Sequence, residues 1–161
     1  MATKGTPATV LLSAQRIDHT LHPYDVAPDS PGYGAQVAAA LGVAPDQLFK
    51  TLVTEVDGAL TVAVVPVSRE LDLKALAGAV GGKRAALADR VVAERTTGYV
   101  RGGISPLGQR KPLPTVIDSS IADLDTVYVS AGRRGLQVSL AAAELVRLTA
   151  ATVSPITAAR P

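Results

Sequence analysis

Hydrophobic and polar residues alternate most clearly in two segments near the middle of the chain. Leu48–Val56 and Ala59–Val67 are rich in β-branched side chains, and Asp57-Gly58 between them is a strong signal for a two-residue hairpin turn. The pattern therefore predicts an antiparallel pair of strands joined by a tight turn.

The rest of the chain mixes helical and extended patterns. Helices are expected from Pro7, capped by Thr6, to about Arg16, over Tyr33–Leu41, from Asp72 through Val80, from Asp89 to about Thr96, and from Ala141 to about Ala150. Further extended segments are expected at Asp18–Val26, Ala85–Leu87, Thr115–Ile117, Thr126–Ser130 and Leu136–Leu140. Loops are expected at Pro28–Gly34, Gly98–Pro114 and Gly132–Gly135.

These elements do not follow a regular βαβ order. The pattern therefore favours an α+β fold with a curved mixed sheet, which can close into a barrel. A length of 161 residues predicts a single domain over residues 1–161.

Charge is nearly balanced, with 16 basic and 14 acidic residues and a net charge of +2. This excludes a histone-like or tail-type nucleic-acid binder. Several basic residues fall in the second half of the chain: Lys83-Arg84, Arg90, Arg95, Arg101, Arg110-Lys111 and Arg133-Arg134. They fit either a face toward a phosphate backbone or an ordinary solvated surface.

Cysteine is absent, which excludes disulfides, thiolate metal sites and a cysteine nucleophile. His19 and His22 are the only histidines and cannot complete a zinc set or support a convincing serine triad, so we expect no metal and no cofactor. No apolar signal segment follows Met1–Lys4, and no apolar run approaches membrane-spanning length. We therefore expect a cytoplasmic protein without a membrane partner.

Lys50 is the first candidate for chemistry. By strand alternation it shares a face with Leu48, Leu52 and Val56. A lysine on an apolar face is either an edge or snorkelling residue, or a cation held in a pocket to meet a negative charge. The pattern alone leaves both readings open.

The glycine-dense loop is the second candidate. Gly102-Gly103 would let backbone N–H groups approach a ligand closely, as an oxyanion or carboxylate site requires. The alternative is a purely structural loop. Neither a phosphate-loop nor a dinucleotide-binding motif is present in it.

Together these segments resemble the YbaK-type Cys-tRNA(Pro) deacylases, within the superfamily of prolyl-tRNA editing domains, over nearly the whole chain. The stretches that carry the resemblance are Phe49-Lys50-Thr51-Leu52, Glu70-Leu71-Asp72-Leu73-Lys74, Thr97-Gly98-Tyr99, Gly102-Gly103-Ile104-Ser105-Pro106-Leu107-Gly108-Gln109, Tyr128-Val129-Ser130 and Gly132-Arg133-Arg134-Gly135-Leu136.

The resemblance implies an α+β domain with a mixed β-barrel flanked by helices, and it implies that Lys50 is the family's essential lysine. Gly102, Gly103, Ile104, Ser105 and Pro106 match the family's Gly-x-x-x-Pro loop beside the scissile ester. By the same resemblance, Tyr24, Tyr33, Thr51 and Ser130 fall at pocket positions, whereas Gln137 and Ser139 stand where some relatives carry acidic residues.

The activity implied is removal of cysteine from mischarged tRNA(Pro), in trans, beside prolyl-tRNA synthetase. In this family the substrate's own thiol is thought to attack the ester and leave as a thiolactone. Two alternatives stay open at this point. One is an editing enzyme for another small amino acid such as alanine, and the other is a non-catalytic module that binds a synthetase or transfer RNA.

Overall fold

The computed structural model describes residues 5–27 and 30–158. Met1–Lys4, and Pro28 and Asp29 of the expected loop, lie outside the described residues. The helices are α1 (Pro7–Ala14), α2 (Tyr33–Leu41), α3 (Leu73–Ala79), α4 (Arg90–Thr97) and α5 (Ala142–Thr149), with short 3-10 helices η1 (Pro45–Gln47) and η2 (Ser119–Asp123). The strands are β1 (His19–Pro23), β2 (Phe49–Val56), β3 (Ala59–Pro66), β4 (Glu70–Leu71), β5 (Ala85–Leu87), β6 (Thr115–Asp118), β7 (Thr126–Arg133), β8 (Leu136–Ala141), β9 (Thr152–Ser154) and β10 (Thr157–Ala158).

The helix boundaries follow from local capping chemistry. The Asp72 side chain accepts a hydrogen bond from the Ala75 N–H at 3.1 Å, and Asp89 does the same for Val92 at 3.2 Å. Helix α2 ends at Gly42, whose φ of 70° is one that glycine adopts without strain. The predicted starts of α3 and α4 and the predicted end of α2 are confirmed.

The predicted hairpin is also confirmed. Strands β2 and β3 pair antiparallel along their whole lengths, from Phe49 opposite Pro66 to Val56 opposite Ala59. The turn residue Asp57 has φ 50° and the following Gly58 has φ 84°. Positive φ at both positions is the geometry of a turn whose twist matches that of the strands it joins.

The described strands form three sheets, with orders β1-β8-β7, β10-β4 and β5-β2-β3-β6-β9. The five-stranded sheet is mixed, because β6 pairs parallel to both β3 and β9, whereas the other two sheets are antiparallel. An isolated parallel bridge joins Leu48, the residue before β2, to Tyr128 of β7 in the three-stranded sheet. The α+β mixed architecture is confirmed, but among the described residues no closed barrel forms, since one bridge does not make a continuous strand ladder.

Two other features differ from the sequence prediction. The turn before β8 is narrower than Gly132–Gly135, because β7 continues to Arg133 through a bulge that follows Ser130. Strands β4, β9 and β10 were not predicted. Each is only two or three residues long, which is too short for a period of two to be read.

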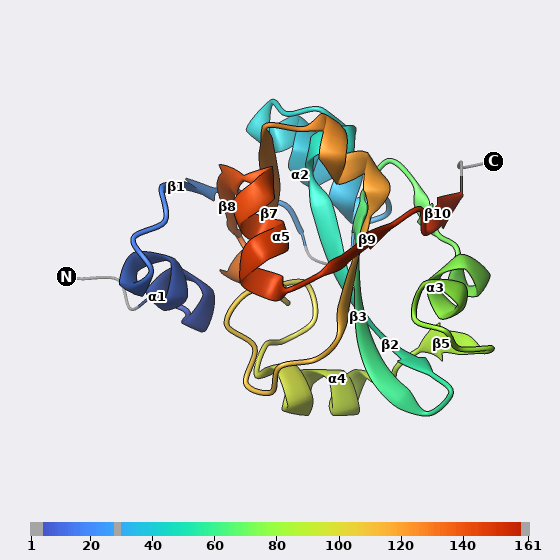
Figure 1. The fold of residues 1–161 in the computed structure, drawn as a ribbon. Coiled ribbons are helices and arrows are strands. Elements are labelled where there is room, and N and C mark those ends of the chain that lie inside the picture. Colours follow the sequence, from blue (N-terminus) through green and yellow to red (C-terminus); the bar gives the residue numbers. More distant parts are fainter. Residues whose placement is uncertain (1–4, 28–29, 159–161) are drawn as a thin grey trace.

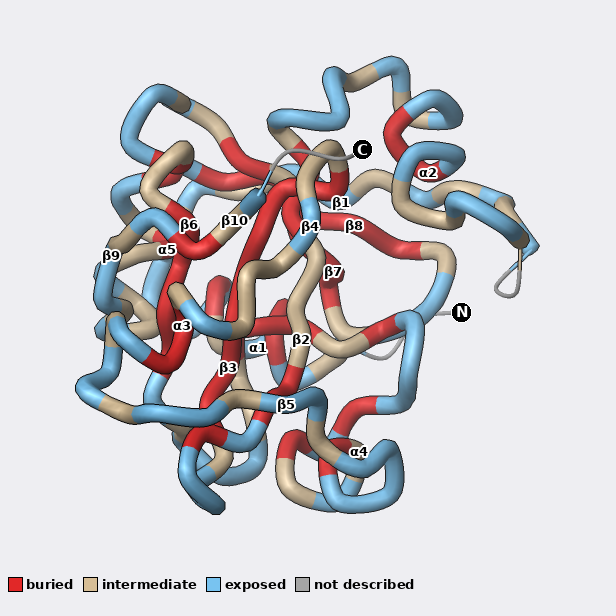
Figure 2. Tube along the Cα trace, turned by 90° about the vertical axis from the view of Figure 1, so that its right-hand side faces the viewer, coloured by how far each residue is buried: buried red, intermediate tan, exposed pale blue. Residues whose placement is uncertain are grey.

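Strand β3 is buried on both faces. Val62 and Val64 pack into the core shared with β7, β8, α1 and α5, whereas Ala63 and Val65 pack into a second core with α3. Figure 1 shows β2 and β3 running through the middle of the molecule between these groups, and Figure 2 shows β3 buried along most of its length.

Within the described ranges, no helix has the length and apolar character needed to cross a membrane.

A third apolar cluster seats α2 over the start of β2. Its buried members are Val37, Ala38, Leu48 and Val67, and Tyr24, Tyr33 and Tyr128 pack against it. This packing fixes Tyr33 at the edge of β2, next to the site described below.

Candidate active site

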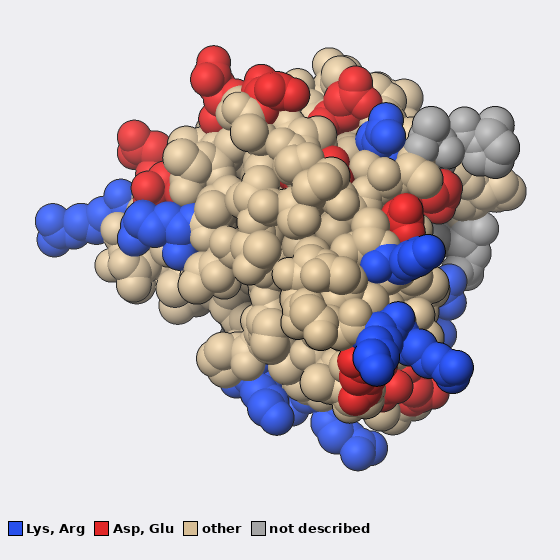
Figure 3. Space-filling view, turned by 45° about the vertical axis from the view of Figure 1, so that its right-hand side comes forward, with Lys and Arg blue, Asp and Glu red and all other residues tan. Residues whose placement is uncertain are grey.

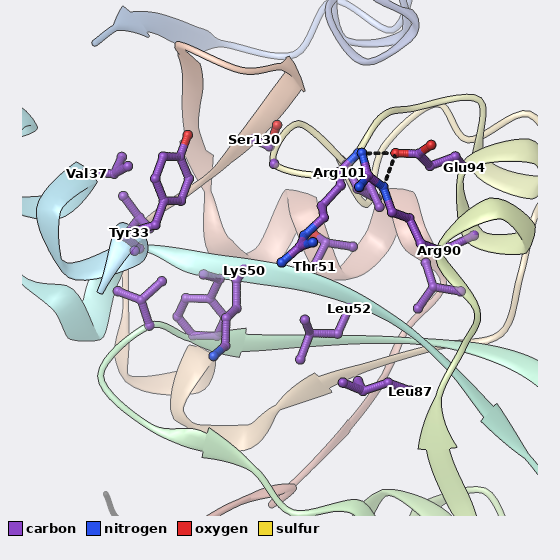
Figure 4. Close-up of a pocket in the computed structure, with 18 of the residues that line it drawn as sticks. Tyr33, Val37, Lys50, Thr51, Leu52, Leu87, Arg90, Glu94, Arg101 and Ser130 are labelled. Carbon is purple, nitrogen blue, oxygen red and sulfur yellow. Dashed lines mark hydrogen bonds and ion pairs between the residues drawn. The ribbon is translucent and has the colours of Figure 1, made fainter. Parts of the chain in front are cut away.

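A cavity of about 450 Å³ opens beside β2. Its walls come from α2, β2, α4, the loop 98–114 and the β7–β8 pair, so five segments distant in sequence meet there (Figure 4). Of the residues proposed from sequence, the cavity lining includes Tyr33, Lys50, Thr51, Gly102, Ile104 and Ser130. Such a concave, largely apolar cavity with a few convergent polar groups is the usual form of a small-molecule site.

Lys50 lies on the part of β2 that only β3 pairs, because β5 pairs with β2 only from Thr54 onward. Its side chain is half-buried and has no hydrogen bond or ion pair with any other described residue. The open edge of β2 from Phe49 to Val53 lines the cavity. The lysine is therefore a strand-edge residue that also lies at a cavity wall.

Two buried oxygen atoms on the cavity wall lack partners. Thr51 Oγ1 and Gln137 Oε1 are both buried without a hydrogen bond, and Gln137 is only 6% exposed. A buried acceptor without a partner costs roughly 1–3 kcal/mol, so a ligand that brings donors would recover this cost. Gln137 was not among the predicted pocket residues. Its register could have indicated it, because it pairs directly with Ser130.

Two tyrosines close one end of the site. The hydroxyl groups of Tyr24 and Tyr33 lie 2.7 Å apart, with Tyr33 in the lining and Tyr24 behind it. Burial and the hydrogen bond between Tyr33 and Tyr24 raise the pKa of Tyr33 above its usual value. Tyr33 therefore presents a neutral hydroxyl at physiological pH.

The glycine loop differs from the expectation of two free amides. The Gly103 N–H donates to the Val100 carbonyl at 2.9 Å, which closes a turn. Among the described residues the Gly102 amide has no such partner, and Gly102 lines the cavity. A Cβ on Gly103 would lie 2.7 Å from the Arg133 backbone. Gly103 therefore serves close packing, and Gly102 remains as the candidate donor.

The next three loop residues also differ in whether they line the cavity. Ile104 lines the cavity, whereas Ser105 and Pro106 are buried behind it. Ser105 Oγ accepts a hydrogen bond from the Leu107 N–H at 3.2 Å, so its hydroxyl stabilises the loop from within.

Glu94 of α4 holds the loop in place, a role that the sequence did not reveal. Its carboxylate accepts the Arg101 N–H at 2.7 Å and contacts the Arg90 side chain at 3.4 Å (Figure 4). The hydrogen bond from the Arg101 backbone is the main cause that lowers the pKa of Glu94. Glu94 is thus an ionised anchor, already committed to two partners.

The basic residues of the second half do not form one face. Arg90, Arg101 and Arg134 line a second compartment of about 720 Å³ that adjoins the first, whereas Lys83 and Arg84 lie at the far end of the β2–β3 hairpin beside Asp57. Figure 3 shows the same dispersion, with charged side chains spread around a largely uncharged surface.

The two histidines are held apart. His19 Nδ1 lies 2.7 Å from the Ile17 carbonyl, and His22 Nε2 lies 2.8 Å from Ser139 Oγ. Neither lines either compartment. Over the residues that the structure describes, no group of three or more histidine, cysteine, aspartate or glutamate side chains could hold a metal ion.

Comparison with known proteins agrees with this geometry. Residues 29–148 match the model of the aminoacyl-tRNA editing domain. The chain is 43% identical over 124 residues to EbsC of Enterococcus faecalis, a protein named provisionally as a Cys-tRNA(Pro)/Cys-tRNA(Cys) deacylase; the match spans 75% of this chain and 74% of EbsC. It is 35% identical over 101 residues to a proline–tRNA ligase of Moorella thermoacetica, a match that spans 63% of this chain but only 18% of the ligase.

The likeness extends to solved structures. A crystal structure described provisionally as a trans-editing enzyme for prolyl-tRNA synthetase aligns with a TM-score of 0.82, over 97% of this chain and 99% of that chain. At 22% sequence identity, this match shows a common fold.

Proposed function

The chain belongs to the aminoacyl-tRNA editing domain family, and we propose that it removes cysteine from mischarged Cys-tRNA(Pro) by attack of the substrate's own thiol. The observation that carries the proposal is Lys50, a half-buried cation without a partner at a cavity whose wall also includes the Gly102 amide. Lys50 and the Gly102 amide are groups that could stabilise an oxyanion. Among the described lining residues, no nucleophilic side chain has a general base beside it.

The lining supports attack by the substrate. The chain has no cysteine, and no histidine lines either compartment. The carboxylate in the cavity wall, Glu94, is ionised and bound to the Arg101 amide and the Arg90 side chain. The hydroxyls of Thr51 and Ser130 therefore have no general base at hand, and a serine-type mechanism lacks its activating partner.

The chemical step balances without a cofactor. The cysteinyl sulfur forms a bond to the ester carbonyl carbon, the bond from that carbon to the ribose oxygen breaks, and the thiol proton passes to the ribose oxygen. The products are transfer RNA with a free hydroxyl and a cyclic thiolactone, which water then opens to cysteine. Holding the thiol near the carbonyl converts the attack into an oriented intramolecular reaction.

Lys50 and the Gly102 amide are assigned to the carbonyl oxygen. As sulfur adds, negative charge develops on this oxygen, and a cation and an N–H donor at a desolvated wall stabilise that charge more than they stabilise the ground state. The side chains of Thr51 and Gln137 line the cavity and carry acceptor oxygens, and these are assigned to the substrate's α-amino group, which requires binding to expose the two buried atoms. Glutamine at position 137 performs this role without a charge.

Prolyl-tRNA synthetase is the proposed source of the substrate. A proline pocket cannot strongly reject a side chain as small as that of cysteine, so editing after the transfer is a physical remedy. The match of this chain to a segment of a proline–tRNA ligase supports the pairing of the two activities. In this proposal the chain acts in trans on what such a synthetase releases.

A panel of tRNA(Pro) charged with cysteine, serine or alanine tests the proposal. We expect rapid release from Cys-tRNA(Pro) with thiolactone as the first product, and slow release from Ser-tRNA(Pro), because a hydroxyl ionises far less readily than a thiol. Alkylation of the substrate thiol should block release. Equal rates for serine or alanine would favour the small-amino-acid alternative, and binding without any release would favour the non-catalytic module.

A further inference from the structure

The outer compartment carries charge of one sign. Among the described residues its lining includes Lys50, Arg90, Arg101 and Arg134 but no aspartate or glutamate. This is notable in a chain whose 16 basic and 14 acidic residues almost balance. A concave surface lined by cations concentrates anions, because low-dielectric walls focus the field.

The arginines are positioned by contacts that leave guanidinium groups available. Arg101 is clamped through its backbone: its N–H donates to Glu94 at 2.7 Å, and its carbonyl accepts the Arg134 Nε–H at 2.8 Å. Among the described residues the Arg101 guanidinium itself has no hydrogen-bond or ion-pair partner. Figure 4 shows this side chain extending from the loop toward β2.

Arg134 is held over the same opening. Its side chain crosses Gly102, where a Cβ would lie 2.9 Å from Arg134 Nε. Its charge also acts on Tyr33, whose pKa it lowers against the larger effect of burial. Arg134 uses only Nε in the hydrogen bond to Arg101, and among the described residues its terminal nitrogens have no hydrogen-bond or ion-pair partner.

We propose that Arg101 and Arg134, with Arg90 at the margin, bind the last internucleotide phosphates of the transfer RNA acceptor end. This inference rests on the proposed function, since it assumes that the inner cavity receives the aminoacyl ester. The two compartments share Tyr33, Lys50 and Gly102, so a ligand whose ester lies at Lys50 continues directly into the arginine-lined space. In a charged transfer RNA, the part that follows the ester is a ribose followed by phosphodiesters.

The chemistry of the groups fits a phosphodiester. Guanidinium groups present paired N–H donors that match phosphate oxygens, and these charge-assisted hydrogen bonds are stronger than neutral ones. Among the described residues no acid pairs with the guanidinium of Arg101 or Arg134, whereas Arg90 contacts Glu94 at 3.4 Å. These arginines would position any transfer RNA by its phosphate backbone and would not distinguish one base sequence from another.

The test uses an uncharged RNA minihelix that ends in the tRNA(Pro) acceptor sequence, so no deacylation is involved. Arg101→Gln is the main variant, because backbone contacts hold its loop whatever the side chain. We expect Arg101→Gln to weaken binding about tenfold at low salt, as loss of a hydrogen bond to a charged group does. The slope of log K against log salt should become shallower by about 0.7, the value for one single-strand phosphate contact.

A second RNA carries uncharged methylphosphonates at its last two internucleotide linkages. The wild-type protein should bind it more weakly than Arg101→Gln binds the normal RNA, because the contacts of Arg101 and Arg134 are both lost, and Arg101→Gln should bind this second RNA as the wild type does. Arg134→Gln should behave like Arg101→Gln. Arg95→Gln is the matched control, since Arg95 lies on α4 but lines neither compartment, and we expect wild-type binding from it.

Unchanged affinity and salt slope in Arg101→Gln, or equal losses for both RNAs, would overturn the proposal. Deacylation of Cys-tRNA(Pro) by the wild-type protein is measured separately. If the wild-type protein releases cysteine and Arg101→Gln binds RNA normally, the proposed phosphate binding is wrong and the proposed function stands. A wild-type protein that binds RNA through Arg101 but releases no amino acid defeats the proposed function alone.

Discussion

At the scale of single residues, Lys50 is the position on which the proposed chemistry depends most. Its strand neighbours Leu52 and Val56 pack into the core beside α3, while Lys50 ends at the cavity. No described acidic group pairs with it. A cation kept without a partner at a cavity wall contributes little to folding, and the proposed chemistry gives it a role toward the ligand.

We predict that Lys50→Ala lowers kcat for Cys-tRNA(Pro) by about 10²–10³-fold or more, the effect of losing one oxyanion-stabilising group. The free energy of unfolding should stay the same or rise, because no ion pair is lost. Turnover and urea denaturation measure the two effects. Lys83→Ala, an exposed lysine at the far end of the hairpin, is the control and should change neither. Near-normal turnover in Lys50→Ala would remove this lysine from the mechanism.

At the scale of elements, the glycine loop is built against the β7–β8 turn. Gly102 has φ 86° and lies under the flexible Arg134 side chain, whereas Gly103 faces the Arg133 backbone. The two glycines therefore serve different purposes although they are adjacent. Gly102 allows a left-handed turn at the cavity wall, and Gly103 allows two backbones to touch.

Alanine substitutions should separate these roles. Gly102→Ala should cost about 1–2 kcal/mol of stability, from the left-handed conformation, and should lower kcat because it displaces Arg134 and the amide donor. Gly103→Ala should cost about 1–3 kcal/mol through overpacking against backbone, with turnover per folded molecule closer to wild type. Urea denaturation and single-turnover rates measure both.

Gly78→Ala serves as the control, since nothing lies within 4 Å of a Cβ on this exposed glycine of α3. It should stabilise the protein by about 0.5–1 kcal/mol, the helix-propensity difference between the two residues. The division of roles fails if Gly103→Ala stops turnover while stability is unaffected.

At the scale of the whole molecule, Asp118 ties the carboxy-terminal strands to the central sheet. Its carboxylate accepts the Ile156 N–H at 3.0 Å, the Thr157 hydroxyl at 3.2 Å and the Ser120 N–H at 3.2 Å. Burial raises the pKa of Asp118, but these hydrogen bonds outweigh it and hold the pKa below its usual value. The pKa of Glu94, the anchor of the loop, is also lowered.

Lowered carboxyl pKa values predict loss of stability in acid. In the range between the folded and unfolded pKa values, the unfolded chain binds more protons than the folded one, so stability falls as the pH falls. The free energy of unfolding should be level near neutral pH and should decline below about pH 5, as ordinary carboxyl groups begin to titrate. Denaturant titrations at a series of pH values measure this.

Asp118→Asn should remove part of that decline. It should also lower stability near neutral pH by roughly 1.5–3 kcal/mol, the value of a hydrogen bond to a charged group, because an amide NH₂ replaces one acceptor oxygen. Asp123→Asn, at an exposed aspartate in η2, should match the wild type. An Asp118→Asn profile that parallels the wild-type profile throughout would contradict this account.

The amino-acid sequence by itself determined the features that depend on neighbouring residues. The Asp57-Gly58 turn, the Asp72 and Asp89 caps and the Gly42 helix end were all predicted, because capping and positive φ involve only a few adjacent residues. The face of β2 on which Lys50 lies could be anticipated for the same reason, since alternation along one strand sets the face of each side chain, but the cavity beside that face could not.

Only the tertiary structure decided how distant segments meet. The α4 helix, the glycine loop and the β7–β8 turn bring Arg90, Arg101 and Arg134 to one compartment. The structure also shows that the Gly103 N–H donates a hydrogen bond to the Val100 carbonyl and that Gln137 pairs with Ser130 across β7 and β8. Such contacts depend on which strands pair and in what register, and a short edge strand carries too few residues to specify its partner locally. The sequence therefore indicated which residues could take part in chemistry. Only the tertiary structure showed that the three arginines and Lys50 line the same compartment.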